Sequence, residues 1–107
     1  MTDFNWPHFR GQIRLNVWGD GASIPRPPSG DSVSMDAHDM AALADLVQDV
    51  WMYNQSCAET LLGNLLDEHY IFGSLVVAGL MEGRFKDPEL IRYFTEVHER
   101  SQSSRQA

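Results

Sequence analysis

The sequence predicts a mainly α-helical protein of about three helices, of which the first is either one long helix or two shorter ones, preceded by an extended N-terminal arm that contains the pattern of a short β-strand. Three observations support this fold class. Apolar residues recur at helical spacing from about residue 36 to residue 81, no proline interrupts that stretch, and a clear helix start follows at Asp87-Pro88-Glu89. The length of 107 residues predicts one domain, which we divide into the arm, residues 1–34, and a helical domain, residues 35–107.

Residues 12–18 of the arm alternate between apolar and polar side chains. Ile13, Leu15 and Val17 share one face of this segment, which is the period-two pattern of a half-buried strand. A single strand makes no sheet, so it would pair with residues 4–9, with a second copy of the protein or with the edge of a partner's sheet. The alternative is an arm that packs on the helices through its aromatic side chains. A cluster of prolines predicts an extended connector over residues 24–30.

The helical domain opens with two apolar stripes that lie side by side. Ser34 or Asp36 can accept the free N–H groups of the first turn. The first stripe has three–four spacing and consists of Met40, Leu43, Val47, Val50, Asn54, Cys57 and Leu61. The second consists of Leu46, Trp51, Ala58, Leu62, Leu65 and Leu66. Together they make a face wider than one neighbouring helix would cover.

The length of this stretch leaves two alternatives open. An unbroken helix over residues 36–66 would be about 45 Å long, whereas a domain of this size has a radius of gyration of about 13 Å. Such a helix would overhang its own core and require a second chain. The alternative is a break, either at the capping-box pattern of residues 56–59 or near Asn64, which would let the stripes fold onto each other.

Two further helices complete the domain. Residues 69–82 are apolar nearly all round, which is typical of a central core helix, and Gly83 is a natural C-terminal stop. In the last helix Asp87 serves as the N-cap, Pro88 occupies the first turn and Glu89 suits the helix dipole.

Composition and charge narrow the function classes. The net charge of −7 disfavours direct binding of nucleic acid, because phosphate contacts need a basic face. The single cysteine, Cys57, allows neither an intramolecular disulfide nor a cysteine-based zinc site. The N-terminus lacks the features of a signal peptide, and the longest apolar run is too short to span a bilayer. We therefore expect a cytoplasmic protein that does not enter a membrane.

No pattern in the sequence assembles an active site. The histidines, at positions 8, 38, 69 and 98, lack the spacing of metal ligands. Asp67-Glu68-His69 is typical of a solvated helix junction, and Cys57 lies on an apolar stripe. We predict no catalytic, cofactor-binding or metal-binding residues and no enzyme activity.

The surplus of apolar surface instead predicts a protein partner. The residues expected to contact it are Leu43, Leu46, Val47, Val50, Trp51 and Leu62 on the stripes. A second set of expected contacts lies on the arm: Ile13, Leu15, Val17 and Trp18.

The short aromatic arm, the helical stretch over residues 36–66 and the terminal helix at Asp87-Pro88-Glu89 make up a plan that resembles the small quorum-sensing antiactivators of pseudomonads. The resemblance implies a non-enzymatic regulatory protein that binds a LuxR-type transcription regulator, masks its dimerisation surface and so blocks DNA binding. A homodimer that hides the apolar surface until the partner arrives is consistent with this reading. The other class of binder that the composition allows is an immunity protein or antitoxin that masks a basic toxin.

Overall fold

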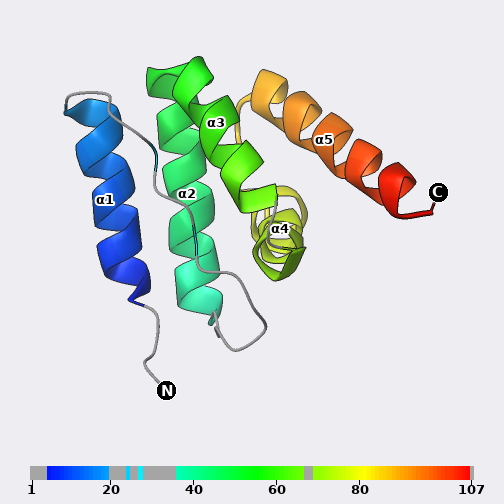
Figure 1. Ribbon diagram of the computed structural model, residues 1–107, viewed down its shortest axis with the longest axis horizontal. Coiled ribbons are helices and arrows are strands. Elements are labelled where there is room, and N and C mark those ends of the chain that lie inside the picture. The colour runs from blue at the N-terminus through cyan, green and yellow to red at the C-terminus, as the bar shows by residue number, and fades with distance from the viewer. Residues whose placement is uncertain (1–4, 20–23, 25–26, 28–35, 67–68, 107) are drawn as a thin grey trace.

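The computed structural model describes residues 5–19, 24, 27, 36–66 and 69–106, the side chains of residues 66, 69–70 and 102–106 excepted. These residues form five α-helices and one π-helix (Figure 1): α1 (Trp6–Trp18), α2 (Ala37–Tyr53), α3 (Gln55–Leu66), α4 (His69–Leu75), η1 (Val76–Met81) and α5 (Pro88–Gln106). The prediction of a mainly α-helical fold is confirmed. The predictions of about three helices and of an N-terminal strand are wrong, since the described residues hold more helices and no strand.

The segment predicted as a strand is the second half of α1. The buried residues of this helix lie three or four positions apart: Trp6, Phe9, Ile13 and Val17. The side chain of Asn5 accepts a hydrogen bond from the backbone N–H of His8 at 2.9 Å, which caps the helix. The alternation of residues 12–18 was misleading because positions 13 and 17 share a face in a helix as well as in a strand. A helix also buries Trp6 and Phe9 together with them, and it satisfies its own backbone, which a lone strand cannot do.

The arm is therefore not extended over residues 6–18. The predicted connector over residues 24–30 lies outside the described residues except for Ile24 and Pro27. Ile24 packs against the core, and its carbonyl oxygen accepts a hydrogen bond from Asn64 Nδ2 at 3.3 Å.

Helices α1 and α2 run parallel to each other. Both begin at the lower edge of Figure 1 and end at the upper edge. Three pairs join them in ascending order along both helices: Arg10–Asp39 at 3.2 Å, Arg14–Asp49 at 3.8 Å, and the rings of Trp18 and Tyr53 with their centroids 5.0 Å apart. The C-terminal ends of the two helices consequently lie side by side.

The stretch over residues 36–66 is broken at Asn54, two residues before the predicted capping box. Asn54 has an extended backbone, with φ −154° and ψ 100°. Its backbone N–H donates to the carbonyl oxygen of Val50 at 2.7 Å, which ends α2, and its Oδ1 accepts from the N–H of Cys57 at 3.2 Å, which starts α3. Helix α3 then folds back along α2 (Figure 1), so the two halves of the double stripe pack together.

Residues 69–81 form α4 and the π-helix η1, so the segment is helical as predicted, but it is not buried all round, since Val77 and Met81 are exposed. The backbone N–H of Glu82 donates to the carbonyl oxygen of Val77, five residues earlier, at 2.9 Å. The chain turns at Gly83, where φ is +76°, a value that favours glycine. Phe85 then returns onto Gly79, and a Cβ atom at position 79 would lie 2.6 Å from Phe85 Cζ.

The start of α5 is as predicted. The Oδ1 atom of Asp87 accepts from the backbone N–H of Glu89 at 2.8 Å and from that of Leu90 at 3.3 Å. Helix α5 covers the core through Phe94, which stacks on Phe72 of α4 with a centroid distance of 4.6 Å. Among the described residues, no helix is long and apolar enough to cross a membrane.

Candidate functional site

The stripe residues that the sequence assigned to a partner lie inside the protein. All six are buried in one core cluster: Leu43, Leu46, Val47, Val50, Trp51 and Leu62. Helices α1, α3 and α4 and the π-helix pack on α2, and Trp51 meets Tyr93 of α5 with a centroid distance of 5.5 Å. The surplus of apolar surface is therefore covered within the chain, and these side chains offer no surface to a second protein.

The arm residues divide into two pairs. Ile13 and Val17 are buried against the core, whereas 64% of Leu15 and 39% of Trp18 are exposed. Leu15 lies on the side of α1 that faces away from the buried residues. The structure thus leaves two of the ten predicted contact residues on the surface.

Two further apolar side chains are exposed at the end of α2. Met52 is 64% exposed and Tyr53 is 56% exposed. Trp18 is the last residue of α1, Tyr53 is the last residue of α2, and their rings stack with a tilt of 35°. We call the surface made by Leu15, Trp18, Met52 and Tyr53 the aromatic corner.

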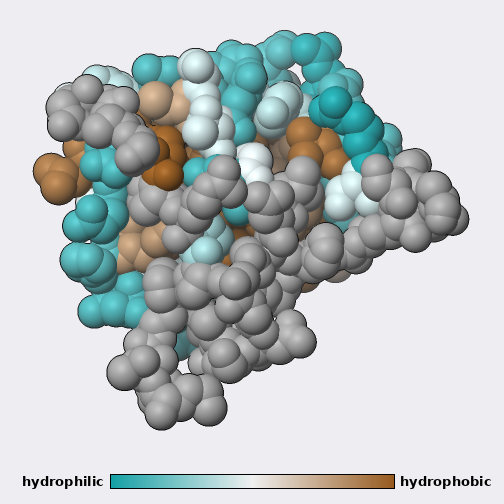
Figure 2. Space-filling view, viewed as in Figure 1, coloured by the Kyte–Doolittle hydropathy of each residue, from teal (hydrophilic) through white to brown (hydrophobic). Residues whose placement is uncertain are grey.

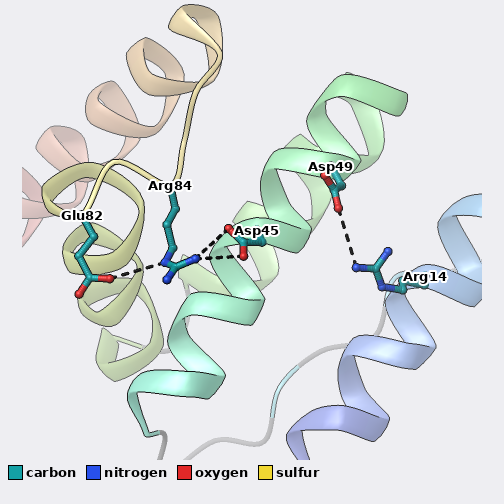
Figure 3. Close-up of polar contacts among 5 residues, drawn as sticks. All are labelled: Arg14, Asp45, Asp49, Glu82 and Arg84. Carbon is teal, nitrogen blue, oxygen red and sulfur yellow. Dashed lines mark hydrogen bonds and ion pairs between the residues drawn. The ribbon is translucent and has the colours of Figure 1, made fainter.

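A charged pair lies one helical turn before the aromatic pair on both helices. Arg14 precedes Trp18 by four residues, and Asp49 precedes Tyr53 by four. Figure 3 shows the two side chains pointing toward each other from α1 and α2, with Arg14 Nη2 3.8 Å from Asp49 Oδ2. Both side chains are 57% exposed, and the Arg14 guanidinium also lies 5.9 Å from the centre of the Trp18 ring. The corner is therefore locally balanced in charge, although the whole chain is acidic.

A second charged group has a structural role. Arg84 joins Asp45 of α2 at 3.1 Å and Glu82 at 3.6 Å (Figure 3). Nearby, Gln48 Oε1 accepts hydrogen bonds from the backbone N–H groups of Lys86 and Asp87. These contacts fix the segment between η1 and α5 against α2.

The remaining titratable groups form no reactive cluster in the described part of the chain, where no three His, Cys, Asp or Glu side chains are grouped to hold a metal ion. Desolvation raises the pKa of Tyr93, the charge of Glu59 adds to this rise, and Arg100 opposes it. The Nδ1 atom of His98 is buried without a hydrogen-bond partner among the described residues, and its ring stacks on Phe72. Cys57 is half-buried and packs against the core.

The exposed large hydrophobic residues of the described chain fall into two groups, of which the aromatic corner is one. Figure 2 shows one face, on which hydrophobic residues are visible at several places, among them a group at the edge of the C-terminal half of α1. Among the residues whose side chains the structure describes, the other exposed large hydrophobic ones are Val77 and Met81, both on η1. Neither is aromatic, so the corner is the stronger candidate for a binding surface.

The contacts expected from the sequence include neither Met52 nor Tyr53. Both follow the last stripe residue of α2, Trp51, and precede the cap residue Asn54. The available signal was that neither residue belongs to either apolar stripe. The contact of Tyr53 with Trp18 depends on the parallel packing of a helical α1, which follows neither from the predicted strand nor from the alternative of an extended arm packed on the helices.

No protein-family model, no curated protein and no solved structure matches this chain. The described residues define it as an all-α protein with one hydrophobic core cluster and an exposed aromatic corner.

Proposed function

We propose that this chain is a non-enzymatic regulatory protein that binds another protein through the aromatic corner. The observation that carries the proposal is the exposure of the stacked pair Trp18 and Tyr53, whose helices also expose Leu15 and Met52. Tryptophan and tyrosine are enriched among residues that dominate binding energy, and contiguous apolar patches of a few hundred Å² often mark interaction sites.

The partner we propose is a LuxR-type transcription regulator, whose dimerisation surface the corner would mask in the cytoplasm. The support for this choice is the exposed apolar chemistry of the corner, and the resemblance of the terminal helix start at Asp87-Pro88-Glu89 to the quorum-sensing antiactivators suggests the class of partner to test. Dimer interfaces of regulators are richer in apolar area than ordinary surfaces. An exposed apolar patch on a small protein can replace one subunit there, because burial of apolar area stabilises either complex.

The experiment is direct binding between the purified chain and the ligand-binding domain of a LuxR-type regulator, measured by isothermal titration calorimetry. Sedimentation velocity would report the regulator's dimer, and a gel-shift assay its DNA binding. We expect the two proteins to form a complex, and we expect the regulator to lose both its dimeric state and its DNA binding. Trp18→Asp should weaken binding about a hundredfold or more, as expected for a hot-spot residue.

Met81→Asp is the matched control, because Met81 is exposed and apolar but lies on η1. Its affinity should equal that of the wild type. Equal affinity of Trp18→Asp and wild type for the regulator would refute the corner as the contact surface.

Salt dependence separates this function from that of an antitoxin. Binding through the charge-balanced corner should change less than about threefold when salt rises from about 0.1 M to 0.5 M. Masking of a basic toxin by the net charge of −7 would weaken much more steeply over the same range.

A further inference from the structure

We infer that the aromatic corner is self-complementary and that a second copy of this chain covers it when no partner is bound. The inference deepens the proposed function and rests on it in one respect: the same surface serves both complexes, so the dimer must dissociate before the partner binds.

The geometry of four side chains carries the inference. Arg14 and Trp18 stand one turn apart on α1, and Asp49 and Tyr53 stand one turn apart on the parallel helix α2. They form a rectangle with a charged pair across one end and an aromatic pair across the other, over the seam between the two helices.

A two-fold axis along this seam makes the rectangle match itself. Rotation about that axis brings α1 of one copy opposite α2 of the other. Arg14 of each copy then faces Asp49 of its partner, and Trp18 of each faces Tyr53 of its partner. A two-fold interface requires this reciprocity, in which residue i meets j and j meets i. An arrangement with both charges of one sign on the seam would repel itself.

The charged pair is held loosely enough to exchange. Its separation of 3.8 Å is long for a charge-assisted hydrogen bond, and both side chains are more than half exposed. In the dimer each guanidinium can keep its own carboxylate and reach the carboxylate of the other copy. The contact between the Arg14 guanidinium and the Trp18 ring orients the arginine toward the seam.

The size of the surface sets the strength of the dimer. Leu15 on α1 and Met52 on α2, each 64% exposed, add to the apolar surface of the aromatic pair, and apolar patches on monomeric proteins measure about a few hundred Å². Stable interfaces bury about 800 Å² per partner, so the corner supports a weak dimer at the small end of the range. A dimer of that kind dissociates on dilution and yields to a partner that binds more tightly.

Sedimentation equilibrium on the full chain, up to about 1 mM, tests the inference. We expect a reversible monomer–dimer equilibrium for the wild type. Arg14→Asp and Asp49→Arg, each alone, should weaken self-association about tenfold or more, because each places like charges opposite each other in both symmetry-related contacts of the charged pair.

Mixing the two single variants should restore association to about the wild-type level, since the mixed dimer regains both opposite-charge contacts. The variant carrying both substitutions should also dimerise. Arg92→Asp is the matched control, because Arg92 forms an exposed ion pair with Glu89 on α5, and it should dimerise like the wild type. Circular dichroism would verify that each variant is folded.

A monomeric wild type at every concentration would overturn the inference, and so would a mixture that associates no better than either variant alone. The proposed function can fail separately. If Trp18→Asp abolishes self-association but leaves binding of the regulator domain intact, the second copy still occupies the corner and the proposed function is refuted. If Trp18→Asp abolishes regulator binding and the wild type is a monomer, the proposed function stands and the inference of a dimer is refuted.

Discussion

Substitution of Gly79 by alanine should destabilise the protein, although alanine favours helices over glycine. A Cβ atom at this position would lie 2.6 Å from Phe85 Cζ and closer still to Phe85 Cε2, whereas carbon atoms in contact are ordinarily about 3.5–4.0 Å apart. The ring would therefore have to move by about 1 Å or more. It has little room to do so, because Phe85 is buried and packs edge-on against Phe94 with a centroid distance of 5.1 Å.

The size of this effect follows from two opposing terms. Overpacking a core costs about 1–3 kcal/mol, and replacing glycine by alanine in a helix returns about 0.5–1 kcal/mol. We expect a net loss of about 1–2 kcal/mol in the free energy of unfolding, which lowers Tm by about 5–15 °C in a domain of this length. Urea denaturation followed by circular dichroism would measure the first quantity, and thermal unfolding the second.

Gly73→Ala is the matched control. Gly73 lies in α4, six residues before Gly79, and a Cβ atom there would have no neighbour within 4 Å. This variant should gain about 0.5–1 kcal/mol through helix propensity and the reduced entropy of the unfolded chain. If both variants are stabilised equally, Phe85 does not pack on Gly79 as described and the reasoning fails.

Three other predictions concern the core, a cap and pH. Leu46→Ala should lower the free energy of unfolding, measured in urea, by about 2–5 kcal/mol because the side chain is fully buried. Leu15→Ala should change that free energy by less than about 0.5 kcal/mol and should weaken self-association. A larger loss of stability for Leu15→Ala than for Leu46→Ala would refute the assignment of Leu46 to the core. Asp87→Ala should cost about 1 kcal/mol by removing the cap of α5, and Asp87→Asn, which keeps the acceptor, should lose much less. The hydrogen bond from the N–H of Asp39 lowers the pKa of Asp36 below its usual 3.8, so the contribution of Asp36 is complete above that value and is lost as pH falls through the lower folded pKa. Urea denaturation between about pH 6 and pH 2 should therefore show a smaller loss of stability for Asp36→Asn than for the wild type, and equal losses would contradict this origin of the shift.

The sequence was sufficient for the features that depend on local chemistry. Asp87 caps its helix as predicted and Asp36 is one of the two predicted caps of α2, because a capping carboxylate bonds to N–H groups only two or three residues away. Asn54 works in the same way, but its role was hidden because it also fits the spacing of the first stripe. A residue that satisfies two patterns at once cannot be assigned by pattern alone. The sequence pattern could therefore not decide whether residues 36–66 form one helix or two.

The binding surface depends on long-range packing, which the stripes do not encode. A stripe shows that a face is apolar, but not whether the chain itself or a second protein covers it. Helix α1 covers one side of α2 within the chain. Because residues 12–18 were predicted as a strand, that side of α2 was left without a helix to cover it. Once Ile13 and Val17 are placed on a helix, Leu15 must point away from them, and the pattern that suggested a strand instead identifies an exposed leucine.

The parallel packing of α1 and α2 explains why the exposed aromatic residues meet. Helices joined by a short connection run antiparallel, which would place the end of α1 beside the start of α2. Here the chain must return along the full length of α2, about 25 Å for its 17 residues. The segment over residues 19–36 is long enough, since it can span up to about 60 Å. A shorter connection would not allow this return, and Trp18 would then lie beside Asp36 instead of Tyr53. The long proline-containing segment therefore matters to the proposed function through its length, because it lets two helices end at one corner.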